Sequence, residues 1–278
     1  MLTRTLLCAC LTALVAAVRA DADTNSVQLP VKAEFHLYLL MGQSNMAGRG
    51  KIEPEDRTPH PRVVVFTANG QWEPAIEPVT HDKPAMLGAG PGLAFGKAMA
   101  RKEPRVSIGL VPCALGGTPL RRWEPGADLY SNAVQRAELA MRDGTLKGIL
   151  WHQGESDSVT STNARTYGER LAHMVAEFRR DLGCPNLPFV AGQIGRFLYE
   201  RGPEHAPYAR IVNDAVARLP KDLPAAAYVS SKGLKDKGDM LHFNSASQRE
   251  LGRRYAKAML KLQALANRKA KAESMRAQ

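Results

Sequence analysis

Residues 37 to 48 read Leu-Tyr-Leu-Leu-Met-Gly-Gln-Ser-Asn-Met-Ala-Gly. The first part of this stretch is an apolar run without polar alternation, which predicts a strand buried on both faces, as in a parallel sheet. Gly42 permits a sharp turn at the end of that strand. Ser44 then lies just beyond the strand's carboxyl end, where functional groups of open α/β sheets gather. A serine here also commonly caps a following helix, so its partners elsewhere in the chain must decide its role.

The rest of the chain alternates predicted strands with predicted helices. Apolar runs predict strands at residues 106–112, 148–151, 188–194 and 226–230, and helical spacing predicts helices at 92–102, 131–142, 164–182, 208–219 and from Ser245 onward. Ser245-x-x-Gln248 and Ser247-x-x-Glu250 both have capping-box form at the start of the last helix. This alternation predicts an α/β fold, a three-layer α/β/α sandwich with a mainly parallel central sheet.

The N-terminal residues predict export. Arg4 precedes an apolar stretch from Leu6 to Val18, and small residues follow, which is the form of a secretory signal over residues 1–20. A membrane anchor is the weaker interpretation, because the apolar stretch is shorter than the about 20 residues that span a bilayer. We therefore expect a secreted or periplasmic protein without stable membrane insertion. Cys113 and Cys184 would remain after cleavage, and their pairing stays open.

The net charge and the motifs of the chain indicate which kinds of ligand and macromolecular partner to expect. The chain has 278 residues, enough for one large domain or two small ones, and we predict one domain over 21–265 because no linker or internal repeat divides it. The formal net charge of +11 arises partly from a basic tail over 266–278. Basic tails can attract nucleic acid or anionic surfaces, but no aromatic residues interleave with these bases, so we expect a solvated helix end and no nucleic-acid partner. Neither Cys-x-x-Cys nor His-Glu-x-x-His occurs, and we expect no metal and no cofactor. The oligomeric state stays open.

Polar segments stand beside several predicted strand ends, and the strands of a parallel sheet would bring them to one edge. The segments are Gly42-Gln43-Ser44-Asn45, Ala114-Leu115-Gly116-Gly117-Thr118, His152-Gln153-Gly154-Glu155-Ser156-Asp157 and Asp239-Met240-Leu241-His242. Together they contain the parts that acyl transfer needs, namely a nucleophile, a base, a carboxylate that orients the base, and donors for an oxyanion.

Each part has a candidate residue. Ser44 is the predicted nucleophile, and His242 is the predicted base, because an imidazole with a pKa near ~6.5 can take and return a proton at neutral pH. Asp239 precedes His242 by one turn of chain and can orient its ring. The backbone N–H groups of Ser44 and Gly117, with the side-chain amide of Gln153, are the predicted oxyanion donors, each worth roughly 3–4 kcal/mol. Taken singly, each residue could be structural, as a helix cap or a loop stabiliser; their combination favours catalysis.

The same segments resemble the sialate O-acetylesterase and carbohydrate esterase family 6 (acetyl xylan esterase) branch of the SGNH hydrolases. The resemblance runs from about Phe35 to Met259 and includes the order and spacing of all the blocks. It implies the flavodoxin-like SGNH hydrolase fold and a serine esterase that acts on carboxylic ester bonds.

The resemblance also implies residue roles. The first block supplies the nucleophile Ser44, the glycine block and Gln153 supply oxyanion donors, and the last block supplies His242. Gln153 stands where most SGNH hydrolases have an asparagine, which is typical of this branch. Members of the branch differ in the acid of the triad, so either Asp239 or Glu155 could serve, and nearness to His242 favours Asp239.

The leading hypothesis is a carbohydrate O-acetylesterase that forms an acetyl-serine intermediate on acetylated xylan, O-acetylated sialic acid or a related glycan. A non-catalytic carbohydrate-binding protein on the same fold is disfavoured, because every catalytic position holds a competent residue. A phosphate or nucleotide binder at Gly116–Thr118 is disfavoured too, since no phosphate-loop or dinucleotide fingerprint is present. Trp72 and Trp123 fall in predicted loops, where they either stack on sugar or pack on the domain itself.

Overall fold

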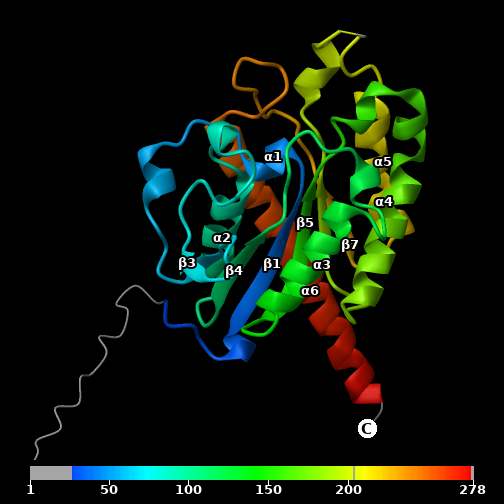
Figure 1. Ribbon diagram of the computed structural model, residues 1–278. Helices are drawn as coiled ribbons and strands as arrows, with labels where there is room; N and C mark the ends of the chain where they lie inside the picture. Colours follow the sequence, from blue (N-terminus) through cyan, green and yellow to red (C-terminus); the bar gives the residue numbers. More distant parts are fainter. Residues whose placement is uncertain (1–26, 203, 277–278) are drawn as a thin grey trace, which may run out of the picture.

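The computed structural model describes residues 27–202 and 204–276, which form a layered α/β domain around one seven-stranded sheet (Figure 1). The strand order is β3-β2-β4-β1-β5-β6-β7, and every pairing is parallel except that of β2 with β3. The strands are β1 (Phe35–Gly42), β2 (Val63–Phe66), β3 (Trp72–Pro74), β4 (Ser107–Pro112), β5 (Thr145–His152), β6 (Phe189–Gly192) and β7 (Ala226–Val229).

Helices cover both faces of this sheet. The α-helices are α1 (Ser44–Ala47), α2 (Pro91–Lys102), α3 (Asp128–Ala140), α4 (Ser161–Asp181), α5 (Ala209–Asp222) and α6 (Ser245–Arg276). Short 3₁₀ helices are η1 (Lys32–Glu34), η2 (Pro54–Arg57), η3 (Pro84–Met86), η4 (Leu120–Arg122), η5 (Asp157–Val159) and η6 (Arg196–Glu200). Helices α2 and α6 pack on one face, and α3, α4 and α5 pack on the other (Figure 1). The predicted α/β/α sandwich is confirmed.

Strand β1 lies between β4 and β5 and is buried on both faces, as its apolar run predicts. Leu37, Leu39 and Met41 point into the core layer under α3, α4 and α5. Tyr38 and Leu40 point into the layer under α2 and α6. Because both faces of the strand are covered, polar alternation would place polar side chains in a core. Strand β1 ends at one edge of the sheet, and the turn at Ser44 follows it there.

The tryptophans belong to the core. Trp72 lies in β3, a short antiparallel edge strand within a region predicted as loop, and its ring centroid is 4.7 Å from that of Phe35. Trp123 is fully buried, and its ring centroid is 5.3 Å from that of Trp151. Neither ring is free to stack on a sugar, so of the two interpretations only packing on the domain itself holds.

Helix α6 begins at Ser245 as predicted, but its cap differs from the predicted one. The side-chain oxygen of Asn244 accepts the backbone N–H of Ser247 at 2.9 Å. The Ser245 hydroxyl instead donates to the carbonyl of Lys51, and the Ser247 hydroxyl accepts the N–H of Lys235. The capping-box prediction is therefore wrong, because both serines bind neighbouring loops and the asparagine before them satisfies the free N–H group of the helix.

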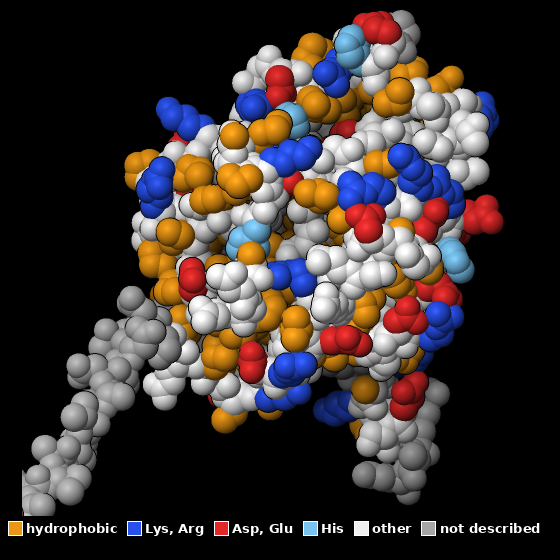
Figure 2. Space-filling model, in the orientation of Figure 1, with side chains coloured by type: hydrophobic (Ala, Val, Ile, Leu, Met, Phe, Trp, Pro, Cys, Tyr) orange, Lys and Arg blue, Asp and Glu red, His pale blue; other side chains and the backbone are white. Residues whose placement is uncertain are grey.

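The far end of α6 projects from the body of the molecule (Figure 1). Side chains from 264 to 275 are exposed, in agreement with the solvated helix end expected from the composition. On the face shown in Figure 2, Lys and Arg side chains are interspersed with Asp and Glu. The positive net charge is thus not gathered into one patch on that face.

The predicted signal sequence, residues 1–20, lies outside the described residues. Among the helices at 27–202 and 204–276, none is both long enough and apolar enough to cross a membrane. Cys113 and Cys184 are half-buried free thiols and are not joined to each other.

Candidate active site

The predicted turn follows β1 directly. Gly42 has a φ of +130°, and a Cβ added there would lie 2.1 Å from the carbonyl oxygen of His152, so only glycine fits. The N–H of Gln43 donates to that same carbonyl at 2.9 Å, and the carbonyl of Gly42 accepts the N–H of Leu115 at 3.0 Å. These bonds tie together the ends of β1, β5 and the loop after β4. Helix α1 then begins at Ser44.

Ser44, His242 and Asp239 form one hydrogen-bonded line. The Oγ atom of Ser44 lies 3.1 Å from Nε2 of His242, and Nδ1 of His242 lies 2.7 Å from Oδ2 of Asp239. The other oxygen of Asp239 accepts the backbone N–H groups of Leu241 at 3.0 Å and His242 at 2.8 Å. A carboxylate at Nδ1 keeps the ring proton there, so Nε2 is left to accept the serine proton.

The surroundings of Asp239 and His242 set the charge states that transfer of a proton from Ser44 to His242 requires. Burial opposes ionisation of Asp239, but hydrogen bonds from the backbone and ring of His242 and from the backbone of Leu241 outweigh it and lower the pKa of Asp239 to about 2. Burial lowers the pKa of His242, against the effect of Asp239, and the cations of Lys237 and Arg49 lower it further. At neutral pH, Asp239 is ionised and His242 is an uncharged base.

The glycine turn after β4 packs directly against the serine. A Cβ added at Gly116 would lie 3.4 Å from Cβ of Ser44. Ser44 is the first residue of α1, so its N–H has no acceptor within the helix. Among the described residues, the N–H of Gly117 has no backbone acceptor. The N–H groups of both predicted oxyanion donors thus have no backbone acceptor in the part of the chain that the structure describes, and the glycine turn that carries one of them packs against the serine.

A buried ion pair holds this glycine turn in place, and the sequence reasoning missed both of its members. Arg49 and Asp82 pair with almost no exposed side-chain surface. The same Asp82 oxygen accepts the N–H of Gly116 at 3.1 Å, while Lys83 donates to the carbonyl of Gly116 at 3.1 Å. Arg49 and Asp82 fall in the long predicted loops, and loop length was the one signal that pointed to them.

Gln153 is brought to the same turn but is fully buried. Its amide nitrogen lies 2.6 Å from Asp157, 3.0 Å from the carbonyl of Thr118 and 3.1 Å from the side-chain oxygen of Gln43. Both amide hydrogens thus face acceptors of the protein. Donation by Gln153 to an oxyanion requires one of these bonds to be exchanged, so in this structure it connects the segments of the site.

Glu155 contacts Asn45 rather than His242. One carboxyl oxygen of Glu155 accepts the side-chain N–H of Asn45 at 2.6 Å and lies 4.0 Å from Nε2 of His152. Burial, partly offset by the hydrogen bond from Asn45, raises the pKa of Glu155 to about 7. Of the two acids that the sequence left open, the structure therefore places Asp239 beside His242 and Glu155 against Asn45 in the turn that follows β1.

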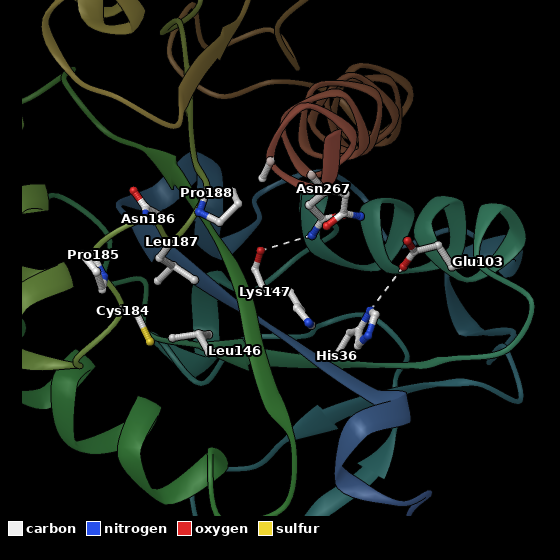
Figure 3. Close-up of a pocket in the computed structure, with 12 residues that line it drawn as sticks. His36, Glu103, Leu146, Lys147, Cys184, Pro185, Asn186, Leu187, Pro188 and Asn267 are labelled. Carbon is white, nitrogen blue, oxygen red and sulfur yellow. Dashed lines mark hydrogen bonds and ion pairs between the residues drawn. The ribbon is translucent and has the colours of Figure 1, made fainter. Parts of the chain in front are cut away.

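A separate cavity of about 380 Å³ lies near the opposite, amino-terminal ends of β1 and β5 (Figure 3). His36 and Glu103 are hydrogen-bonded at 3.3 Å on one side of it, and apolar side chains such as Leu146 and Leu187 lie on the other. None of the predicted site residues lines this cavity. It is distinct from the site around Ser44.

Comparison with known proteins identifies the family. A family model described as "Carbohydrate esterase, sialic acid-specific acetylesterase" matches residues 34–261. The chain belongs to this family. All four segments of the site lie within the matched residues, and the resemblance seen in the sequence is confirmed.

Individual relatives of this esterase agree with the family match. It is 35% identical over 257 residues to a probable carbohydrate esterase of Arabidopsis thaliana, covering 86% of this chain and 95% of the relative. The X-ray structure of the Arabidopsis thaliana protein AT4G34215 aligns with a TM-score of 0.74 and 33% identity, covering 84% of this chain and 99% of that one. The crystal structure of NanS aligns with a TM-score of 0.69 and 20% identity, covering 85% and 99%, which supports the fold.

Proposed function

We propose that this carbohydrate esterase is a serine hydrolase that removes O-acetyl groups from a glycan. The observation that carries the proposal is the line from Ser44 Oγ through His242 to Asp239, with distances of 3.1 and 2.7 Å. Residues from two distant parts of the chain meet there in the order that nucleophilic catalysis needs. Family membership supports the class of substrate, and the geometry supports the mechanism.

In the proposed reaction, Ser44 Oγ attacks the carbonyl carbon of the acetyl ester as its proton passes to Nε2 of His242. The backbone N–H groups of Ser44 and Gly117 stabilise the oxyanion, and Gln153 joins them where one of its present bonds is exchanged. Collapse of this intermediate expels the sugar hydroxyl, which takes the proton from His242, and leaves acetyl-Ser44. His242 then activates a water molecule that releases acetate and restores the serine.

The proposed substrates are acetylated xylan, O-acetylated sialic acid or a related glycan. The description of the family, sialic acid-specific acetylesterase, supports the second of these. Residues 1–20 support action outside the cytosol, because their sequence has the form of a cleavable secretory signal. We therefore propose a secreted or periplasmic enzyme that meets its glycan there.

The test is acetate release by residues 21–278 from acetylated xylo-oligosaccharides and from O-acetylated sialic acid in parallel. Ser44→Ala should lower kcat by at least about 10³-fold, because among the described residues no other side-chain hydroxyl is hydrogen-bonded to His242, while the unfolding transition stays close to that of the wild type. Wild-type activity in Ser44→Ala would contradict the serine mechanism. Saturable sugar binding without hydrolysis of either glycan or of a simple aryl acetate would favour the binding protein.

A further inference from the structure

The side chain of Asn45, the residue directly after the nucleophile, contacts the main chain on both sides of the base. Its amide nitrogen donates to the carbonyl of Leu241 at 3.1 Å, and its amide oxygen accepts the N–H of Phe243 at 3.1 Å. Leu241 and Phe243 are the two neighbours of His242. The side chain of Asn45 is fully buried, so water does not compete for these bonds.

We propose that Asn45 is a positioning residue that holds His242 in register with Ser44. The proposal rests on the serine mechanism given above and adds a residue that acts through the histidine. Ser44 and His242 are 198 positions apart in the chain, and a single hydrogen bond joins their side chains. Asn45 adds a second link between the same two segments, from a residue whose place is set by the nucleophile turn itself.

Two other hydrogen bonds near His242 stay within the histidine loop. The N–H of Lys237 donates to the carbonyl of His242 at 2.9 Å, and the N–H of Met240 donates to the side chain of Asp236 at 2.7 Å. These bonds join parts of the loop to each other, so they shape it without tying it to α1. The ring of Phe243 packs on that of His152, with centroids 5.6 Å apart, but such packing permits sliding. The two hydrogen bonds of Asn45 to Leu241 and Phe243 set the position of the histidine loop relative to α1.

Glu155 decides which way the amide of Asn45 points. The amide nitrogen donates to Glu155 at 2.6 Å as well as to Leu241, and the amide oxygen is also approached by Gln248 at 3.4 Å. A reversed amide would set oxygen against two acceptors and nitrogen against two donors, which costs the full penalty of unpaired buried groups. The carboxyl oxygen of Glu155 accepts this bond whether or not the group is ionised. Glu155 therefore acts on the histidine through Asn45 rather than as the acid of the triad.

The first test compares Asn45→Ala with Asn213→Ala. Asn213 on α5 is a matched control, since its side chain is also buried and donates to the carbonyl of Ile194 at 3.0 Å and to the hydroxyl of Tyr199 at 2.7 Å. For Asn45→Ala we expect kcat on an aryl acetate to fall on the order of 10²-fold with KM changed less than about threefold, the cost of a small misplacement of a catalytic group. Asn213→Ala should keep kcat per folded molecule. Equal kcat in the two variants overturns the proposal.

A second comparison separates positioning from general support of the fold. In a His242→Ala background, Asn45→Ala should leave the residual rate unchanged within about twofold, because a residue that acts through the histidine has nothing left to position. If Asn45→Ala lowers the residual rate by the same factor as in the wild type, its role is structural and the proposal fails.

A third measurement does not depend on any substrate. In a crystal structure of Asn45→Ala, we expect the Ser44 Oγ to His242 Nε2 distance to exceed about 3.5 Å, beyond a hydrogen bond. An unchanged distance of 3.1 Å would overturn the proposal. If the wild type hydrolyses no ester, the serine mechanism fails, and this distance still decides whether Asn45 sets the position of His242.

Discussion

Among single residues, two carboxyl groups near Ser44 have opposite pKa shifts. Asp239 is held ionised by hydrogen bonds from the residues around it, and its pKa is lowered to about 2. Glu155 lies in a buried place where the pKa is raised to about 7. Environments that push two pKa values apart in this way mark different roles for the two acids. The ionised group is the one beside the imidazole.

This difference predicts unequal effects of neutralising each acid. Asp239→Asn should lower kcat on the order of 10³–10⁴-fold, because an amide no longer holds the ring of His242 in the tautomer that leaves Nε2 free. Glu155→Gln should lower kcat less than about tenfold, because its amide oxygen can still accept from Asn45. Steady-state kinetics on an aryl acetate measures both. A larger loss in Glu155→Gln than in Asp239→Asn would make Glu155 the acid of the triad.

At the scale of elements, the site depends on how β1 ends. Gly42 lets the chain turn against β5 while the strand remains paired, so that Ser44 opens α1 at the sheet edge. The ion pair of Arg49 and Asp82 then holds the glycine turn after β4 against the serine. Backbone hydrogen bonds and this ion pair thus pack three sheet-edge segments together.

The turn predicts a large effect of one added methyl group. Gly42→Ala should lose the about 1–2 kcal/mol of a left-handed residue and a further ~1–3 kcal/mol for the clash with the carbonyl of His152, measured as the free energy of unfolding in urea. Gly126→Ala is the matched control, because Gly126 has a φ of +83° and nothing lies within 4 Å of its added Cβ. Equal losses in the two variants would show that the close approach at Gly42 costs nothing.

Across the whole molecule, burial shifts the pKa of several titratable groups toward the uncharged form. Burial raises the pKa of Glu77 to about 8 and that of Glu155 to about 7, although hydrogen bonds to each partly offset it. Burial lowers the pKa of His152 to about 3. The folded state keeps the two glutamates protonated above the pH at which the unfolded chain releases those protons. It also keeps His152 neutral below the pH at which the unfolded chain binds one.

These shifts predict how stability depends on pH. The stabilisation from protonated Glu77 and Glu155 is fully present below about pH 4.5 and is lost as pH rises through about 7 and 8, since the unfolded state then binds fewer protons than the folded state. His152 acts in the other direction, and its contribution is lost as pH falls from about 6.5 toward 3. Urea unfolding of the wild type and of Glu155→Gln at pH 6 and pH 9 tests this. Glu155→Gln should lose less stability over that interval, and an equal loss would contradict a protonated Glu155.

The layers of this protein and the segments that form its site are predictable from the amino-acid pattern alone. Unbroken apolar runs and helical periodicity are local properties, so β1, α2 and α4 were predicted close to their observed bounds, whereas the strand predicted at 148–151 covers only half of β5. The motifs around Ser44 and His242 follow strands or precede α6, and parallel topology brings such segments to one edge. The short strand β3 was missed because a few residues of an edge strand carry too little pattern.

Which side chains meet across the site depends instead on contacts made in space. The short spacing between Asp239 and His242 favoured Asp239, but the contact of Glu155 with Asn45 joins the loop after β5 to α1, and no spacing along the chain encodes it. The same holds for the burial of Trp123, the cap at Asn244 and the two bonds of Asn45 beside His242. Hydrogen bonds and burial are set by distances in space, whereas sequence patterns report only neighbours along the chain. The segments of the site could therefore be predicted from the sequence, whereas the hydrogen bonds between them could not, because the fold sets them.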